Sequence, residues 1–165
     1  MKTVKENSNE ARFADYRLCI GHDNNYNMPS KHMDMIFTEA AKLDKPIHCF
    51  TVINDDTHEV LVLGTTQEKI DKEFPGLNVN KTEWLENIQA AEKKVWQDAI
   101  DGNVFYMCVQ QWDANERMFV DIDSMYNLYG TDDVQANIPE LYCIGKVTAI
   151  VDATGQFNEL DLTAK

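Results

Sequence analysis

The segments Ile47-His-Cys-Phe-Thr-Val-Ile53, Asn54-Asp-Asp-Thr57 and Glu59-Val-Leu-Val-Leu63 decide the class of fold. Two runs rich in β-branched and aromatic residues flank a cluster of turn-forming residues, which is the pattern of a β-hairpin. A tight hairpin joins antiparallel strands, because a parallel pair needs a long crossover connection. The sequence therefore predicts an α+β fold rather than an alternating α/β fold.

The rest of the chain extends this pattern in both directions. Further strands are expected at residues 16–21, 104–112, 117–123 and 141–152, and residues 157–162 suit a last short edge strand. Apolar spacing and capping residues predict helices from Ser30 to the residue before Pro46, over 67–74, and from Thr82 to about Asp101. Residues 123–130 are expected to form a helical turn and 132–139 a loop. The order β-α-β-β-α-α-β-β-β predicts a mainly antiparallel sheet built from hairpins, with two or three helices packed on it.

The length of 165 residues suits one domain. Residues 1–13 are polar and show no apolar periodicity, so a flexible N-terminus is expected there. Residues 14–165 are expected to form a single α+β domain. If the chain has an internal boundary, the sequence places it between Pro75 and Thr82, where a Pro-Gly pair separates two helices.

The charge of the chain excludes several classes of function. Acidic residues number 28 against 15 Lys and Arg, giving a net charge of −13, and residues 98–165 alone carry net −9. Nucleic-acid binding and binding to anionic membrane surfaces both depend on Lys and Arg, so both are disfavoured. No apolar run approaches the ~18 residues of a membrane span, and no apolar signal segment follows Met1, so the cytosol is the expected compartment.

The acidic C-terminal half has two explanations. One is a solvated face that keeps the protein soluble, and the other is a surface that meets a basic protein partner. Alternation over 117–123 places two carboxylates on the solvent side of a strand, and two tyrosines that follow are expected to be exposed. Tyrosine among carboxylates suits the uptake of Arg or Lys side chains. The candidate partner-binding residues are Asp121, Asp123, Tyr126, Tyr129, Asp132 and Asp133.

The loop 22–34 offers an alternative site for a small ligand or a metal. Its candidate residues, with one from the following strand, are His22, Asp23, His32 and His48. Histidines with a carboxylate can ligate Zn²⁺ or another divalent transition metal, although no H-x-x-x-H spacing supports it. The simpler explanation is that Asx residues shape the loop and the histidines are ordinary surface or core groups. Calcium is only weakly indicated, because Met28 stands where an EF-hand loop requires Gly.

The cysteines and the missing catalytic motifs favour a protein without enzymatic activity. Cys19, Cys49, Cys108 and Cys143 each sit in an apolar run and are expected to be free core thiols on strands. Cys49 follows His48, but strand neighbours point to opposite faces, so the two are not expected to form a catalytic pair. No G-x-S-x-G, Walker A or G-x-G-x-x-G motif occurs, and no cofactor is expected apart from the alternative metal.

The composition favours a small acidic cytosolic binding or inhibitor protein that engages a basic partner. Such a partner would be a nucleic-acid-binding enzyme or a toxin, as for nucleic-acid mimics, phage counter-defence proteins and immunity proteins. The alternative is an enzyme or a small-ligand or metal-binding protein with a pocket at the loop 22–34. A third possibility is a structural or accessory subunit, whose exposed apolar patch would mark the interface. The sequence indicates no particular oligomeric state.

Overall fold

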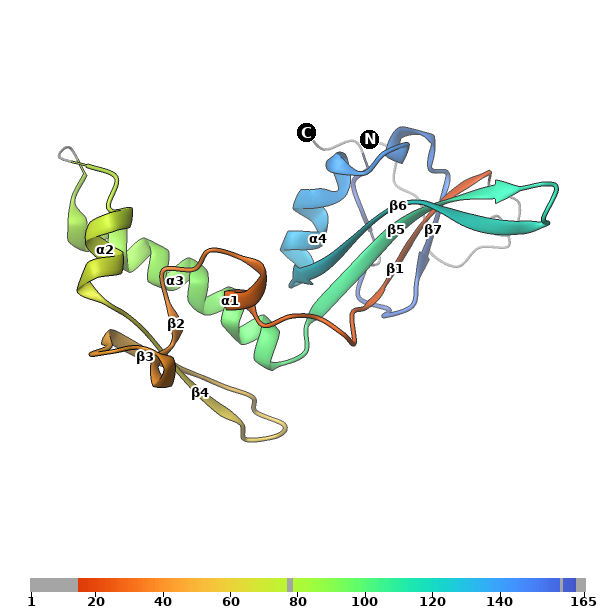
Figure 1. Ribbon diagram of the computed structural model, residues 1–165. Coiled ribbons are helices and arrows are strands. Elements are labelled where there is room, and N and C mark those ends of the chain that lie inside the picture. The colour runs from red at the N-terminus through yellow and green to blue at the C-terminus, as the bar shows by residue number, and fades with distance from the viewer. Residues whose placement is uncertain (1–14, 77–78, 158, 163–165) are drawn as a thin grey trace. The chain divides into compact units, whose positions relative to one another are not determined.

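The chain divides into two units, one of which is inserted into the other (Figure 1). The computed structural model describes residues 15–76, 79–157 and 159–162, so the segment 1–13 that was expected to be flexible lies outside the described residues. Unit 1 comprises Met1–Tyr26 and Asn103–Lys165, and unit 2 is Asn27–Gly102. A boundary between Pro75 and Thr82 is therefore wrong, because that stretch lies within unit 2. The single domain over 14–165 stays a prediction.

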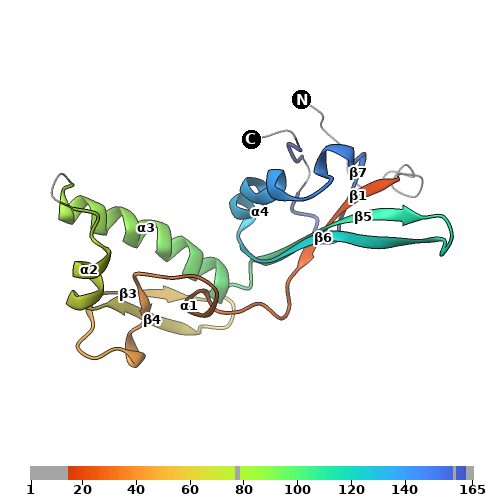
Figure 2. The ribbon, with the colours of Figure 1, turned by 45° about the horizontal axis from the view of Figure 1, so that its top comes forward.

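Unit 1 is built on a four-stranded sheet in the order β6-β5-β1-β7 (Figure 2). The strands are β1 (Tyr16–His22), β5 (Val104–Asp113), β6 (Met118–Tyr129) and β7 (Ala149–Asp152). β5 pairs antiparallel with both β1 and β6, whereas β7 pairs parallel with β1. The first strand of the chain is thus a central strand, completed by partners that follow the whole of unit 2.

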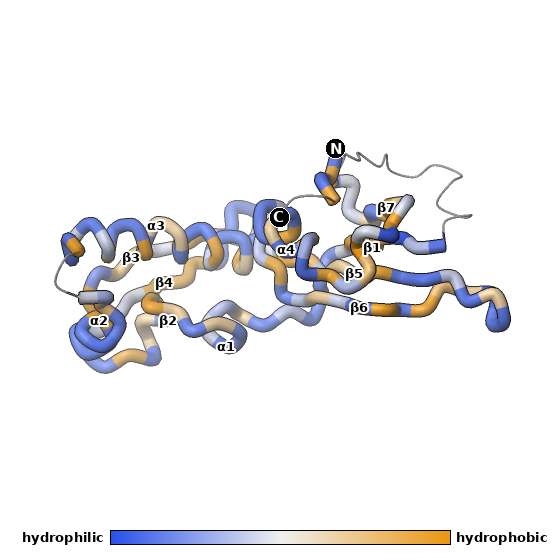
Figure 3. Tube along the Cα trace, turned by 90° about the horizontal axis from the view of Figure 1, so that it is seen from above, coloured by the Kyte–Doolittle hydropathy of each residue, from blue (hydrophilic) through white to orange (hydrophobic). Residues whose placement is uncertain are grey.

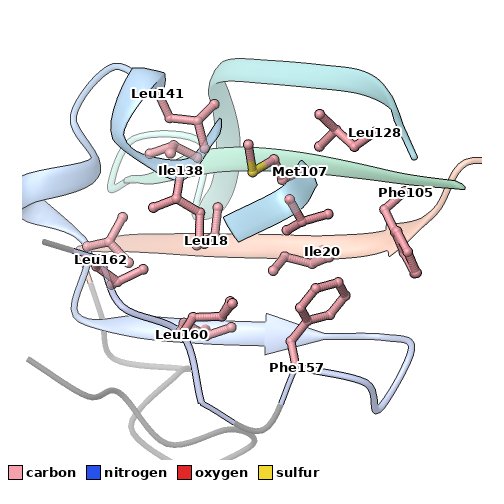
Figure 4. Packing of buried hydrophobic residues seen from close by; sticks show 14 residues of the cluster. Leu18, Ile20, Phe105, Met107, Leu128, Ile138, Leu141, Phe157, Leu160 and Leu162 are labelled. Carbon is pink, nitrogen blue, oxygen red and sulfur yellow. The ribbon is translucent and has the colours of Figure 1, made fainter. Parts of the chain in front are cut away.

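One face of this sheet carries the core of unit 1 (Figure 4). Leu18 and Ile20 of β1 alternate with outward-facing residues, as a strand with one buried face requires. The segments that pack on this inner face are α4 (Thr131–Asn137), η3 (Ile138–Glu140) and the C-terminal residues that follow β7. They contribute Val134, Ile138, Leu141, Phe157, Leu160 and Leu162 to the core.

Four sequence-based expectations for unit 1 are wrong. β6 runs on to Tyr129 instead of turning helical at 123–130, because register shifts in the β5–β6 ladder keep it paired. Residues 132–139 form α4 and η3 instead of a loop. The strand expected at 141–152 is only β7, preceded by η4 (Ile144–Lys146). The described residues within 157–162 form no edge strand and instead bury three apolar side chains.

Unit 2 contains the predicted hairpin in a three-stranded sheet of order β2-β4-β3. Its elements are α1 (Pro29–His32), β2 (Thr38–Glu39), η2 (Ala40–Lys42), β3 (Ile47–Ile53), β4 (Val60–Thr65), α2 (Gln67–Glu73) and α3 (Lys81–Ile100). Figure 3 shows hydrophobic residues along β4 and largely hydrophilic ones along α3. The α3 side chain Trp96 is fully buried with Val52 and Leu63 of the sheet. With both units described, the α+β class is confirmed.

The capping chemistry of unit 2 was largely predictable. The Thr66 hydroxyl accepts a hydrogen bond from the Lys69 N–H and caps α2, as expected. Asn80, and not Thr82, caps α3, and Gly102 follows that helix with φ of 72°. The buried residues of α3 are Leu85, Trp96, Ala99 and Ile100, whereas Ala91 is exposed.

The long helix expected from Ser30 is wrong, because α1 ends at His32 and residues 33–39 run on to the strand β2. The carboxylate of Glu92 on α3 accepts hydrogen bonds from the N–H groups of Ile36 and Phe37 at 2.9 and 2.7 Å. Met35 and Phe37, two positions apart, are both buried. A contact from a distant helix therefore overrides the local helical spacing.

We expect Glu92→Ala to destabilise the protein by about 2–3 kcal/mol, because two half-buried N–H groups lose a charged acceptor. Glu86→Ala removes an exposed carboxylate from the same helix and should cost less than about 0.5 kcal/mol. Urea unfolding of both variants measures the difference. Equal losses in the two variants would show that the bonds from Ile36 and Phe37 do not stabilise this segment.

Candidate functional site

The face of the unit 1 sheet opposite the core presents a patterned set of side chains, here called the outer face. It consists of Arg17, Cys19, Gly21, Tyr106, Cys108, Gln110, Trp112, Phe119, Asp121 and Tyr126, which alternate with the core residues. The register places Arg17 opposite Gln110, and Gln110 opposite Asp121. Cross-strand neighbours on one face lie close enough to interact, so these residues form rows across three strands.

One end of the outer face is aromatic. Gly21 lies opposite Tyr106, and a Cβ atom at Gly21 would lie only 2.6 Å from the Tyr106 ring. Only glycine therefore lets this ring lie against the β1 backbone. Tyr126 of β6 stacks on Tyr106 with ring centroids 6.0 Å apart, and 55% of its surface is exposed. The result is a stacked pair of tyrosine rings, of which the Tyr126 ring is largely exposed.

The middle of the outer face is a hydrogen-bonded network. The Gln110 carbonyl oxygen accepts from Arg17 Nε at 2.8 Å and from Cys19 Sγ at 3.2 Å. The Gln110 amide in turn donates to Asp121 Oδ1 at 2.7 Å. Hydrogen bonds from Gln110 and Cys108 lower the pKa of Asp121, so this exposed carboxylate is charged at neutral pH. The row thus holds an anionic group in place through neutral donors.

The thiols of the outer face are poorly suited to nucleophilic chemistry. Burial, and then the neighbouring Asp121, raise the pKa of the Cys108 thiol to about 12. Burial likewise raises the pKa of Cys19. A nucleophilic cysteine needs a thiolate at neutral pH, and both shifts oppose it. All four cysteines are free thiols, but Cys49 is exposed and Cys143 lies outside the strands, so the expectation of four core thiols on strands is wrong.

The other end of the outer face already binds a guanidinium group. The Arg17 Cζ atom lies 3.6 Å from the centroid of the Phe119 ring, which packs edge-to-face against Trp112. A cation over an aromatic face is a favourable electrostatic contact. The outer face therefore contains an arginine–aromatic contact that is made within the chain.

The structure brings only two of the six predicted partner-binding residues together on the outer face, Asp121 and Tyr126. Tyr129 is 3% exposed, so its expected exposure is wrong, and burial with the nearby Asp23 and Asp133 raises its pKa to about 12. Asp133 accepts hydrogen bonds from the Tyr129 N–H and the Asn137 amide. These contacts tie the end of β6 to α4, so Tyr129 and Asp133 hold the fold.

The remaining two predicted residues lie away from the outer face. Asp123 accepts hydrogen bonds from the Ser124 and Tyr142 N–H groups, which ties β6 to the loop before η4. Asp132 is exposed in the first turn of α4. A sequence signal for the outer face lies instead within 104–112, where Tyr106, Cys108, Gln110 and Trp112 alternate with the apolar residues Phe105, Met107 and Val109. That signal would have identified Tyr106 and Gln110.

The alternative ligand residues belong to different units. His22 and Asp23 lie in unit 1. The His22 ring stacks on that of Phe105 with the ring centroids 5.1 Å apart, and Asp23 accepts hydrogen bonds from the N–H groups of Asn25 and Asn127. His32 ends α1, and His48 is exposed where β3 departs from regular pairing, with φ of 51°. Among the residues that the structure describes, no three His, Cys, Asp or Glu side chains gather into a group able to hold a metal ion.

A buried carboxylate outside the outer face organises the end of β7. Asp152 Oδ1 accepts from the Thr154 N–H and hydroxyl, and Oδ2 accepts from the Phe157 N–H. Burial alone would raise the pKa of Asp152, but these hydrogen bonds favour its charged form, and the pKa lies below its ordinary value. This carboxylate therefore stabilises the fold in its ionised state.

We expect Asp152→Asn to lower the free energy of unfolding by about 1–3 kcal/mol at pH 7. The NH₂ group of asparagine cannot accept a hydrogen bond, so one of the two oxygen acceptors of Asp152 is lost. A lowered folded pKa stabilises above the ordinary aspartate pKa, and this contribution is lost as the pH falls through the folded pKa. The difference in the free energy of unfolding between wild type and variant should thus become smaller below about pH 4. Urea unfolding at pH 7 and pH 3 measures both differences, with the exposed Glu140→Gln as control. A difference that persists unchanged at pH 3 would contradict the expectation.

Comparison of the chain with protein-family models, with curated proteins and with solved structures finds no match. Within the described residues, no helix has the length and apolar character needed to cross a membrane. The chemistry of the outer face and the distribution of charge are therefore the features that indicate a function.

Proposed function

We propose that this chain is a small acidic binding protein that engages a basic protein partner through the outer face of unit 1. The observation that carries this proposal is Tyr126, which is 55% exposed, stacked on Tyr106, and on the same strand as the exposed carboxylate of Asp121. Tyrosine is enriched among the residues that dominate protein interfaces. One partner Arg or Lys can stack on the Tyr126 ring, and a second, further along β6, can pair with the Asp121 carboxylate.

The charge of unit 1 supports a basic partner. The residues of unit 1 include 14 acidic and seven basic side chains, for a net charge of −7. The ion pairs found between described residues, such as Lys69–Asp34 and Lys81–Asp71, lie within unit 2. The carboxylate of Asp121 has Gln110 and Cys108 as hydrogen-bond donors and is ionised. The negative electrostatic field of unit 1 speeds the association of a basic partner and makes the rate of association sensitive to salt.

The partner that fits best presents arginine side chains on its surface. Arg17 over Phe119 shows the geometry in which a guanidinium group meets an aromatic ring on this face. Nucleic-acid-binding enzymes and basic toxins present such side chains, and an inhibitor of either would work by occupying them. We place this activity in the cytosol, whose reducing conditions suit the four free thiols of the chain.

A synthetic peptide of alternating arginine and alanine provides a defined probe. We expect saturable binding that weakens with rising salt and is lost when citrulline, which is neutral and similar in shape, replaces arginine. Asp121→Asn and Tyr126→Ala should each weaken binding at least about 5-fold, since each removes roughly 1 kcal/mol of contact energy. Titration calorimetry of the folded variants, verified by circular dichroism, measures these changes.

Glu140→Gln and Tyr142→Ala serve as matched controls, because both residues are exposed in unit 1 and lie outside the outer face. They remove the same charge and the same type of ring, and should change the affinity by less than twofold. Equal binding of the citrulline peptide, or equal loss in all four variants, would overturn the proposal.

A further inference from the structure

A cavity of about 220 Å³ opens in unit 2, and its lining residues all belong to that unit. One wall is the segment after α1, which contributes Met33, Met35 and Ile36, and the opposite wall is the corner where β4 meets α2. The methionines are flexible and polarisable, so this wall can adapt to guests of different shape. The volume lies below the range of drug-sized pockets, which limits an occupant to a small molecule.

An ion pair joins the two walls of the cavity. Lys69 Nζ on α2 lies 2.8 Å from Asp34 Oδ1 on the segment after α1, and both residues line the cavity. The Asp34 side chain is 80% exposed, and an exposed pair of this kind contributes little net stability. Lys69 also has a second carboxylate within 3.9 Å, that of Glu73 on its own helix. Lys69 can therefore release Asp34 and remain paired.

The wall also contains a polar group that the fold leaves unsatisfied. Thr65 lines the cavity and is almost fully buried, and its hydroxyl has no hydrogen-bond partner among the described residues. Buried hydroxyl groups nearly always have a partner in folded proteins. The hydroxyl oxygen is itself almost inaccessible, so the kind of ligand follows from the ion pair and the apolar wall and not from Thr65.

We infer that this cavity binds a small amphipathic amine. The ammonium group takes the place of Lys69 at Asp34 while Lys69 stays with Glu73, and the hydrocarbon part packs against Met33 and Met35. The site does not depend on the proposed function, since it lies in unit 2 and uses no residue of the outer face.

Charge selects an amine over a carboxylate of the same size. Unit 2 has 14 acidic and eight basic residues, and the whole chain has a net charge of −13. The field of the protein therefore concentrates small cations and repels small anions. An anion that replaced Asp34 at Lys69 would approach against that field, whereas a cation approaches with it.

Three probes of equal chain length separate these possibilities: n-butylamine, butan-1-ol and butyrate. Each is titrated into the full chain at constant ionic strength and followed by the amide NMR signals of Ile36 and Lys69. We expect saturable shifts with butylamine, binding at least about 5-fold weaker for butanol, and the weakest binding for butyrate. Butyrate binding as tightly as butylamine, or shifts that never saturate with butylamine, would overturn the inference.

The variant Asp34→Asn tests the anchoring carboxylate. It should weaken butylamine binding at least about 5-fold and leave butanol binding within twofold. The control Glu68→Gln removes the same charge from an exposed position near the start of α2, outside the cavity wall, and should leave both affinities within twofold. Equal effects of the two variants would show a general effect of charge and no site at Asp34.

Discussion

The pairing of β1 with β5 is the constraint on which the rest of unit 1 depends. Its register runs from Tyr16 opposite Gln111 to His22 opposite Phe105, and it is extended at both ends by main-chain hydrogen bonds of Asp15 and Asp23. The strands are joined through the whole of unit 2, so closing this long loop has an entropic cost that the ladder and its core must offset. One register creates two faces: Leu18 and Ile20 enter the core, while Arg17 and Gly21 meet their partners on the outer face.

The acidic composition has a structural use that the net charge conceals. Asp23, Asp123, Asp133 and Asp152 all accept hydrogen bonds from main-chain N–H groups at places where the chain changes direction. A charged acceptor satisfies such groups more strongly than a neutral one. The excess of acid after Gln97 therefore does not by itself describe a binding surface. Folding also spreads the charge almost evenly over the two units, because the N-terminal residues of unit 1 bring basic side chains to it.

Local chemistry made part of the fold predictable, and long-range contacts decided the rest. The hairpin of β3 and β4 and the Thr66 cap depend on neighbouring residues, so the sequence predicts them well. The extended segment after α1 depends on Glu92, which is 56 residues from Ile36, and no local pattern reveals that contact. The sequence also did not predict the insertion of unit 2 between β1 and β5, because the insertion becomes evident only from the long-range pairing of these two strands. At the candidate site, strand parity predicted Asp121, whereas the exposure of Tyr126 was predicted from its place among carboxylates, in a segment expected to be helical. The mostly apolar run 104–112 does not distinguish Tyr106 from the core residues beside it.

The carboxylates that build the fold and those that can bind a partner differ in what holds them. Main-chain donors are fixed by the backbone, so removing Asp152 would leave the buried N–H group of Phe157 unsatisfied. Asp121 is held by the side chain of Gln110, and Asp34 by the side chain of Lys69. These donors belong to side chains, so at both proposed sites an external cation would replace them without a change in the backbone. The two proposed sites thus use carboxylates other than those that hold the turns of the chain, so binding there would leave the turns intact.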